Sequence, residues 1–309
     1  MLKYIIKRLL AMIPVVIGIT LLVFLIMQLA PGDAVRQILG DSATEEAIQA
    51  KKEELGLLDP LPVQYGKYMI RLVQGDMGTS YVNNRPVSDE VFSRLPATLK
   101  LALVSAVVSI ILAIPLGILA AIKQNTLFDH ASMVVSLIGI SMPAFWLALM
   151  LMLLFSVNLG WFPVQGANDG WRSYVLPAIA IGFMNMAAIA RTTRSSMLDT
   201  IRQDYIRTAR AKGVSEREIV FHHSFRNALI PTVTVIGVQL GGLIGGAVLT
   251  ETVFAWPGLG RYIVQSVNGR DTPAVMGCII VLAVGFSLVN LFVDLLYGFI
   301  DPRVRSMYR

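Results

Sequence analysis

Stretches of apolar residues recur along the chain, and six of them are about as long as a helix that crosses a lipid bilayer. A membrane-spanning helix needs roughly 20 predominantly apolar residues. The stretches cover residues 9–30, 99–122, 132–157, 174–190, 229–249 and 274–300, and the fourth is the shortest. The pattern predicts an all-α membrane protein with six transmembrane helices.

The first stretch follows a basic start, MLKYIIKRLL, as the core of a secretory signal peptide does. Its apolar run is longer than such a core, and no small-residue cleavage site follows it. We therefore expect this stretch to be retained as the first transmembrane helix.

The composition agrees with a membrane protein. Hydrophobic residues make up 55% of the chain and charged residues only 15%, whereas about 25% is usual in a globular domain. The formal net charge of +6 would be compatible with nucleic acid, but orientation and contact with anionic lipid explain basic residues in a membrane chain first. We expect lipid contact and no nucleic acid. The single cysteine excludes an intrachain disulfide and a two-cysteine metal site.

Lysine and arginine gather in the short connections on one side of the predicted helices. They precede the first helix, follow the second and the sixth, and are most frequent after the fourth, whereas the opposite short loops hold only Arg172, Arg261 and Arg270. The positive-inside rule then places both termini and the loop after the fourth helix in the cytoplasm. The sequence predicts a multi-pass protein of a prokaryotic cytoplasmic (inner) membrane.

This topology divides the chain into four parts. They are residues 1–30, with the first helix; an extracytoplasmic segment, 31–97; a five-helix core, 98–300, with a cytoplasmic loop at 191–228; and a tail, 301–309. The outer segment reads as a helix ending near Gly56, a turn, and an amphipathic helix closed by Gly75. It either caps the helix ends or docks an external protein, and both alternatives stay open.

Residues for catalysis inside the membrane are scarce. The chain has no G-x-x-x-x-G-K-[ST] motif, so it lacks the usual loop for ATP phosphates. His222 and His223 are adjacent, and neighbours on a helix point in different directions, so we expect no metal site. The apolar stretches hold no histidine, and Asp294 is their clearest acid, whereas a proton-coupled carrier needs several ionisable groups. A non-transporting membrane enzyme or scaffold is the alternative from another class.

The predicted spans contain residues that favour irregular backbone and close helix packing. Prolines stand at 14, 115, 143 and 177, within or beside apolar stretches, where membrane helices tolerate them. Gly237, Gly241 and Gly245 repeat every four residues and form one smooth helix face. With Gln239 nearby and Glu251 at its outer end, this face is expected either to border a path through the membrane or to serve packing alone. Glu251 is expected at the surface, where it either meets the substrate at the mouth of the path or caps the helix or pairs with Arg261.

A polar, basic sequence, DYIRTARAKGVSEREIVFHHSFRNALIP, lies between the fourth and fifth stretches at residues 204–231. Residues 204–212 favour a helix, Gly213 interrupts it, and Ser215 with Glu218 forms a capping box for a second helix. Pro231 is expected to mark the start of the next membrane helix. The sequence predicts a helix, a glycine turn and a second helix between two membrane spans.

Three roles compete for this helical loop. A DNA-binding helix-turn-helix needs its own folded core and access to a groove of the DNA. A loop that is tethered to the bilayer at both ends has neither. A helix lying on anionic lipid is disfavoured by Asp204, Glu216 and Glu218. We therefore interpret the loop as a compact knob that is offered to a cytoplasmic partner protein.

The loop resembles the cytoplasmic "EAA" loop of ABC importer permeases. Ala209 and Ala211 match its alanine region, Gly213 its glycine, and Leu229 and Pro231 its closing residues. RTTRSSMLD before the loop, APGD after the first stretch, TETVFAWPGLGR after the fifth and DLLYGFIDPRVR near the C-terminus resemble the dipeptide, oligopeptide and nickel permeases of that family. The chain departs from the motif at Asp204 and Thr208, near positions where many members have glutamate.

The resemblance implies a permease subunit of an ATP-driven importer of di- or oligopeptides, with a nickel, metal-chelate or glutathione importer as alternatives. Such a chain would form half of the translocation path. Its partners would be a second, similar permease in a heterodimer, two cytoplasmic ATP-binding subunits and an extracytoplasmic substrate-binding protein. ATP and Mg would bind to the ATP-binding subunits. This chain would bind no cofactor. The residues implied in coupling are Asp204, Tyr205, Thr208, Ala209, Ala211, Gly213, Val214, Ser215 and Glu216.

Overall fold

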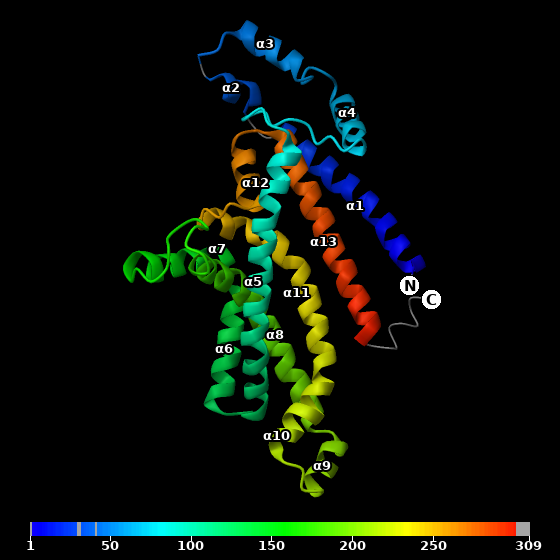
Figure 1. Ribbon diagram of the computed structural model, residues 1–309, viewed down its shortest axis with the longest axis vertical. Helices are drawn as coiled ribbons and strands as arrows, with labels where there is room; N and C mark the ends of the chain where they lie inside the picture. Colours follow the sequence, from blue (N-terminus) through cyan, green and yellow to red (C-terminus); the bar gives the residue numbers. More distant parts are fainter. Residues whose placement is uncertain (1, 30–31, 41, 301–309) are drawn as a thin grey trace. The chain divides into compact units, whose positions relative to one another are not determined.

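A computed structural model describes residues 2–29, 32–40 and 42–300 (Figure 1). Helices dominate, and no β-strand occurs within these residues. The predicted all-α fold class is therefore confirmed. The predicted end of the first span at Ala30 and the tail 301–309 lie outside the described residues.

Helices follow one another along nearly all of the described chain, joined by short connections. They are α1 (Leu2–Leu29), α2 (Ala34–Leu39), α3 (Glu45–Glu54), α4 (Leu61–Val73), α5 (Val87–Ile122), α6 (Leu127–Ser141), α7 (Ala144–Leu151), the π-helix η1 (Met152–Asn158), α8 (Arg172–Ile201), α9 (Asp204–Ala211), α10 (Glu216–Glu218), the π-helix η2 (Ile219–Ser224), α11 (Phe225–Val253), α12 (Leu259–Asn268) and α13 (Thr272–Ile300).

The chain forms two compact units. Among the described residues, the first contains 99–256 and 288–300, and the second contains 2–98 and 257–287. Helices α5 and α13 therefore contribute to both units.

Within the described residues, four helices are long and apolar enough to cross a membrane, namely α1, α5, α8 and α13. The number rises to six if each of two bent pairs counts as one span. One pair joins α6 to α7 and η1 at an angle of 107°, and the other bends by 54° between Leu243 and Ala247 within α11. The predicted spans are thus all helical, but two of them are not straight.

The third predicted span is broken because of a proline. Helix α6 ends at Ser141, and Met142 and Pro143 both have extended backbone, with ψ of 125° and 133°. Proline lacks an N–H and pushes the preceding residue out of the helical region. The chain turns at this corner and resumes as α7, so the stretch predicted as the third span, 132–157, consists of two helices at 107° to each other.

The first unit is built around α8. The packing of α5 on it is close: a Cβ added to Gly117 would lie 2.6 Å from the carbonyl oxygen of Ala190 and 2.6 Å from Cβ of Thr193. The hydroxyl of Thr232 on α11 donates to that of Thr193 at 3.4 Å. Small residues thus allow these helices to approach each other closely.

Helix α8 extends beyond the predicted span, which ended at Ala190. It continues to Ile201 and includes part of the sequence assigned to the cytoplasmic loop. Thr193 and Met197 are fully buried in this extension. Tertiary packing therefore keeps a polar sequence helical.

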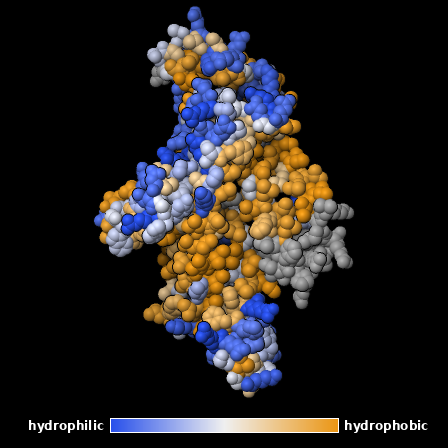
Figure 2. All heavy atoms as spheres, viewed as in Figure 1, coloured by the Kyte–Doolittle hydropathy of each residue, from blue (hydrophilic) through white to orange (hydrophobic). Residues whose placement is uncertain are grey.

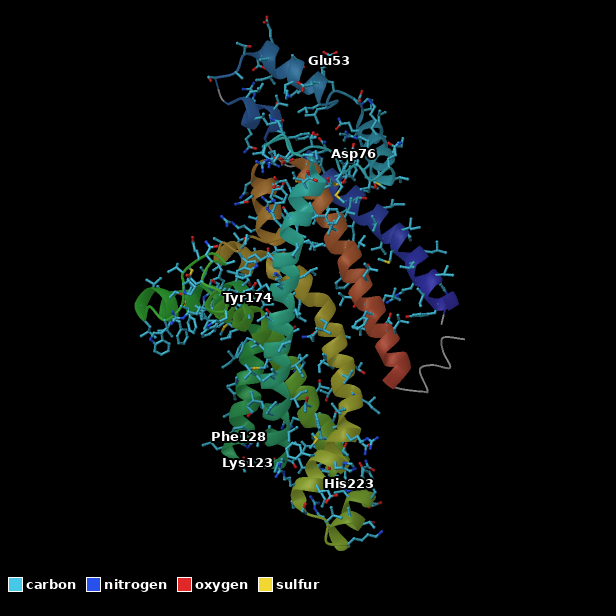
Figure 3. The ribbon with its side chains drawn as sticks, viewed as in Figure 1. Glu53, Asp76, Lys123, Phe128, Tyr174 and His223 are labelled. Atoms are coloured by element: carbon cyan, nitrogen blue, oxygen red, sulfur yellow. The ribbon has the colours of Figure 1, made fainter. Side chains whose placement is uncertain are left out.

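Polar and apolar residues separate clearly over the first unit. In Figure 2 apolar residues cover α5 and α6, and polar residues gather over α9 and α10. Figure 3 shows Lys123, Phe128 and His223 at the end of this unit that carries α9 and α10, with Tyr174 farther along it. This end corresponds to the predicted cytoplasmic side.

The second unit contains the predicted outer segment. As expected, α3 ends before Gly56 (φ +67°) and α4 before Gly75 (φ +85°). Tyr68 on α4 packs in one cluster with Phe24 of α1 and Met276 of α13. A segment that covers helix ends in this way is what the capping alternative requires.

Candidate functional site

The glycine turn of the cytoplasmic loop is present as predicted. Helix α9 ends at Ala211, and Gly213 adopts a left-handed φ of +79°. The N–H of Gly213 donates to the carbonyl of Arg210 at 3.0 Å, and that of Val214 to the carbonyl of Ala209 at 3.2 Å. These two bonds form a Schellman motif, which favours glycine at this position.

The second helix begins at the predicted cap. The hydroxyl of Ser215 accepts a hydrogen bond from the N–H of Glu218 at 3.3 Å. From α10 the chain continues through η2 directly into α11, and Pro231 lies inside that helix. The prediction that Pro231 marks the start of this helix is therefore wrong, because the helix is continuous from Glu216 past Pro231.

We call residues 204–224 the knob. Its apolar side chains anchor it to the membrane helices: Ile206 and Ile219 are fully buried, and Val220 packs with Met197 of α8 and Ala228 of α11 in one cluster. A force applied to the knob therefore reaches these helices directly.

The outer surface of the knob is exposed. The side chain of Asp204 is 97% exposed, and Tyr205 and Phe221 are 44% and 56% exposed. An open hollow of about 390 Å³ is lined by Ser215, Arg217, Glu218, Phe221 and His222. Exposed aromatic side chains next to a hollow are suited to receiving a partner protein.

An ion pair spans the turn of the knob. Arg210 donates from Nε to Oε1 of Glu216 at 2.6 Å and from Nη2 to Oε2 at 3.2 Å. These bonds lower the pKa of Glu216. A depressed carboxyl pKa stabilises the fold above the unfolded-state pKa, and this contribution is lost as pH falls through the folded-state pKa. Because both side chains are exposed, the pair contributes little to stability.

The structure brings the predicted coupling residues together. All nine lie on α9, in the turn or at the start of α10, and most of them are exposed. They are Asp204, Tyr205, Thr208, Ala209, Ala211, Gly213, Val214, Ser215 and Glu216. Tyr205 is held in place because its hydroxyl accepts a hydrogen bond from the amide of Asn227 at 2.8 Å. Within the described residues, no group of three or more His, Cys, Asp or Glu side chains is placed so that it could hold a metal ion.

The predicted path residues lie on α11 but differ in exposure. Gly237 and Gly241 are buried, as packing requires, and Gly245 is exposed. The amide of Gln239 donates to Oδ1 of Asn185 on α8 at 2.9 Å. Asn185 is itself 6% exposed, and no pattern in the sequence pointed to it.

Glu251 does not lie at an exposed mouth. Its side chain has no exposed surface, so the prediction of a surface carboxylate is wrong. A buried carboxylate is costly unless it is paired, and a substitution here is therefore expected to disturb the fold as well as any transport role.

Two family models together match most of the chain. The binding-protein-dependent transport system inner membrane component matches residues 113–306, and the N-terminal part of such membrane components matches residues 1–102. The chain belongs to this permease family. It is therefore the permease subunit of an ABC importer and a multi-pass inner-membrane protein.

Relatives of the permease cover nearly its whole length. The dipeptide transport system permease protein DppB of Alkalihalophilus pseudofirmus is 46% identical over 99% of this chain and 100% of that protein. The glutathione transport system permease protein GsiC of Salmonella paratyphi A is 46% identical over 99% of both chains. Resemblance to the peptide branch of the family is thereby confirmed.

A solved structure shares the fold of the permease. An inward-facing structure of the MetNI methionine ABC transporter aligns with a TM-score of 0.57 and 19% identity, over 68% of this chain and 95% of that one. As a component of a binding-protein-dependent system, the permease works with a substrate-binding protein and an ATPase.

Proposed function

We propose that this permease imports short peptides and that the knob couples it to a cytoplasmic ATPase. The exposed, internally capped knob, continuous with α11 and anchored on α8, carries the proposal. In the proposed complex a second, homologous permease supplies the other half of the path, and two ATP-binding subunits bind ATP and Mg. This chain then needs no cofactor and hydrolyses no ATP.

The peptide substrate is supported by the relatives. One is a dipeptide permease and another a glutathione permease, and glutathione is itself a small peptide. A nickel or metal-chelate importer is the alternative within the family. A non-transporting enzyme or scaffold would leave the exposed knob without a role.

Uptake in reconstituted vesicles tests the substrate. Proteoliposomes that contain the complete complex and its binding protein are expected to accumulate a radiolabelled dipeptide when ATP is supplied on the knob side. An excess of glutathione or of a nickel chelate distinguishes the alternatives by competition. Accumulation of nickel without dipeptide uptake would contradict the peptide assignment.

The orientation of the permease is also proposed: both termini and the knob lie in the cytoplasm, and the segment from Pro31 to Ala97 lies outside. In a background with Cys278 replaced, Asn84→Cys and Asn168→Cys are expected to react with an impermeant thiol reagent in right-side-out vesicles. Arg210→Cys is expected to react only after the vesicles are opened. Labelling of Arg210→Cys in sealed vesicles would reverse the topology.

A further inference from the structure

A buried ion pair joins α6 to α8 near the knob. Arg194 donates from Nε to Oδ1 of Asp129 at 2.5 Å and from Nη2 to Oδ2 at 2.7 Å. The N–H of Asn125 donates to the same carboxylate at 3.0 Å. The side chain of Asp129 is 2% exposed and that of Arg194 is 19% exposed. A two-bond pair of this kind fixes direction as well as distance.

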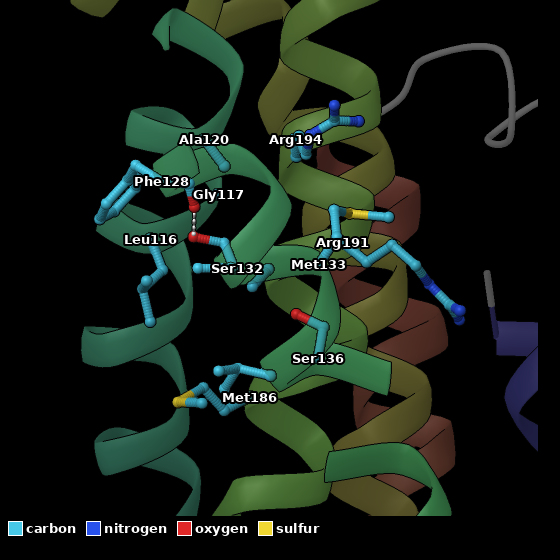
Figure 4. Close-up of a pocket in the computed structure, with 13 residues that line it drawn as sticks. Leu116, Gly117, Ala120, Phe128, Ser132, Met133, Ser136, Met186, Arg191 and Arg194 are labelled. Atoms are coloured by element: carbon cyan, nitrogen blue, oxygen red, sulfur yellow. Dashed lines mark hydrogen bonds between the residues drawn. The ribbon is translucent and has the colours of Figure 1, made fainter. Parts of the chain in front are cut away.

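A cavity lies beside α6, between this helix, α5 and α8. The cavity holds about 220 Å³ and is lined by α5, α6 and α8, including Leu116, Ser136 and Met186 (Figure 4). Its walls are mainly apolar. The side chains that line it lack packing partners on the side that faces the cavity.

Helix α6 approaches α8 closely again near its far end. A Cβ on Gly139 would lie 3.1 Å from Cβ of Ala187 and 3.1 Å from the ring of Phe183. The Asp129–Arg194 pair joins α6 to α8 nearer to the knob than this contact does. Just after α8, Nη2 of Arg202 also donates to Oε1 of Gln124, in the connection before α6, at 3.3 Å.

Arg194 lies about two helical turns before the end of α8, where Ile201 leads into the knob. Asp129 lies in the first turn of α6, and α6 leads through the Pro143 corner into α7. A displacement of the cytoplasmic end of α8 can therefore reach α6 through the Asp129–Arg194 pair and through the bond between Arg202 and Gln124.

We propose that the Asp129–Arg194 pair acts as a clamp that makes α6 follow the cytoplasmic end of α8 during transport. Asp129 and Arg194 are positioning residues in this scheme. The clamp rests on the proposed coupling role of the knob. It extends that role to α6, a helix that is not part of the knob.

The test compares the number of peptides imported per ATP hydrolysed in reconstituted complexes. Asp129→Asn leaves the positive charge of Arg194 unpaired and can impair folding. Asp129→Asn combined with Arg194→Gln leaves no unpaired charge. Both assembled variants are expected to keep hydrolysing ATP and to lose most of the peptide imported per ATP. Lys51→Gln combined with Glu54→Gln, which removes an exposed pair on α3, is expected to leave the ratio unchanged.

A distance measurement separates the clamp from a purely structural role. Spin labels at Leu127 on α6 and Ser195 on α8 are expected to keep one narrow distance with and without ATP in the wild-type complex. In the double variant the distribution is expected to broaden when ATP is added. A normal ratio in an assembled double variant would overturn the clamp, and so would failure of both variants to assemble, which would assign the pair to folding alone.

The Gly213→Val complex, measured alongside, isolates the underlying proposal. If its ratio also equals that of the wild type, the coupling role of the knob is what fails. If its ratio falls while the double variant is normal, the knob couples without the clamp.

Discussion

Replacement of Gly213 by valine is expected to abolish most peptide uptake while ATP hydrolysis by the complex continues. A Cβ at this position would meet no atom within 4 Å, so space is not the obstacle. The obstacle is the φ of +79°, which costs a β-branched residue roughly 1–2 kcal/mol, enough to change a population about tenfold. The Schellman turn would then open, and α9 would lose its fixed direction relative to α10.

Asparagine is the matched control at this position, because it tolerates the left-handed region better than other residues with a side chain. Gly213→Asn is expected to retain most of the uptake. Both complexes should be compared at equal assembly, with uptake and phosphate release measured in the same vesicles. Equal uptake by Gly213→Val and Gly213→Asn would show that the turn geometry does not matter for coupling.

Leucine at Gly241 is expected to prevent correct folding, whereas leucine at Gly245 is expected to leave the fold intact and block uptake. Gly241 is buried, and an added side chain in a packed region costs about 1–3 kcal/mol. Gly245 is exposed, and a Cβ there would meet no atom within 4 Å. The smooth helix face would then serve packing at one position and border the path at the other.

Thermal unfolding and uptake separate these two effects. Gly242→Leu is a useful companion, because Gly242 is also exposed with open space around a Cβ, but it is adjacent to the buried Gly241. A stable Gly245→Leu complex with normal uptake would remove this face from the path. Blocked uptake in Gly242→Leu alone would move the path to the neighbouring face of α11.

Local sequence features predicted the knob well, because its structure depends on short-range chemistry. A left-handed position after ARAK and a serine three residues before Glu218 determine a turn and a cap without help from distant residues. The length of α13 was likewise readable from an apolar run, whereas α5 begins at Val87, well before the predicted start of its span at Leu99. In the knob and in α13 the signal and the structure lie within the same few turns of chain.

Features that depend on distant residues were not predictable in the same way. Proline is compatible with both a continuous and a broken membrane helix, and the structure keeps Pro177 inside α8 but breaks the chain at Pro143. Residues 191–201 are too polar to be read as part of a span, yet burial of Met197 keeps them helical.

The Asp129–Arg194 pair joins residues 65 positions apart, and no motif in the sequence connects them. The same applies to the bond between Asn185 and Gln239. Glu251 shows the converse failure: its position near the end of an apolar run suggested exposure, whereas the fold buries it completely. Burial of a single polar residue depends on what the rest of the chain places around it.

Direct contact between the knob and the ATPase is the central claim about this permease. Thr208 is exposed on α9, and Thr208→Cys in a Cys278-free complex can be cross-linked with a short bifunctional thiol reagent. Leu127→Cys is the control, because Leu127 is 85% exposed in the same unit but lies outside the knob. We expect a covalent product between Thr208→Cys and the ATP-binding subunit, altered in yield by ATP, and none from Leu127→Cys. Absence of that product in an assembled, transport-active complex would contradict the claim.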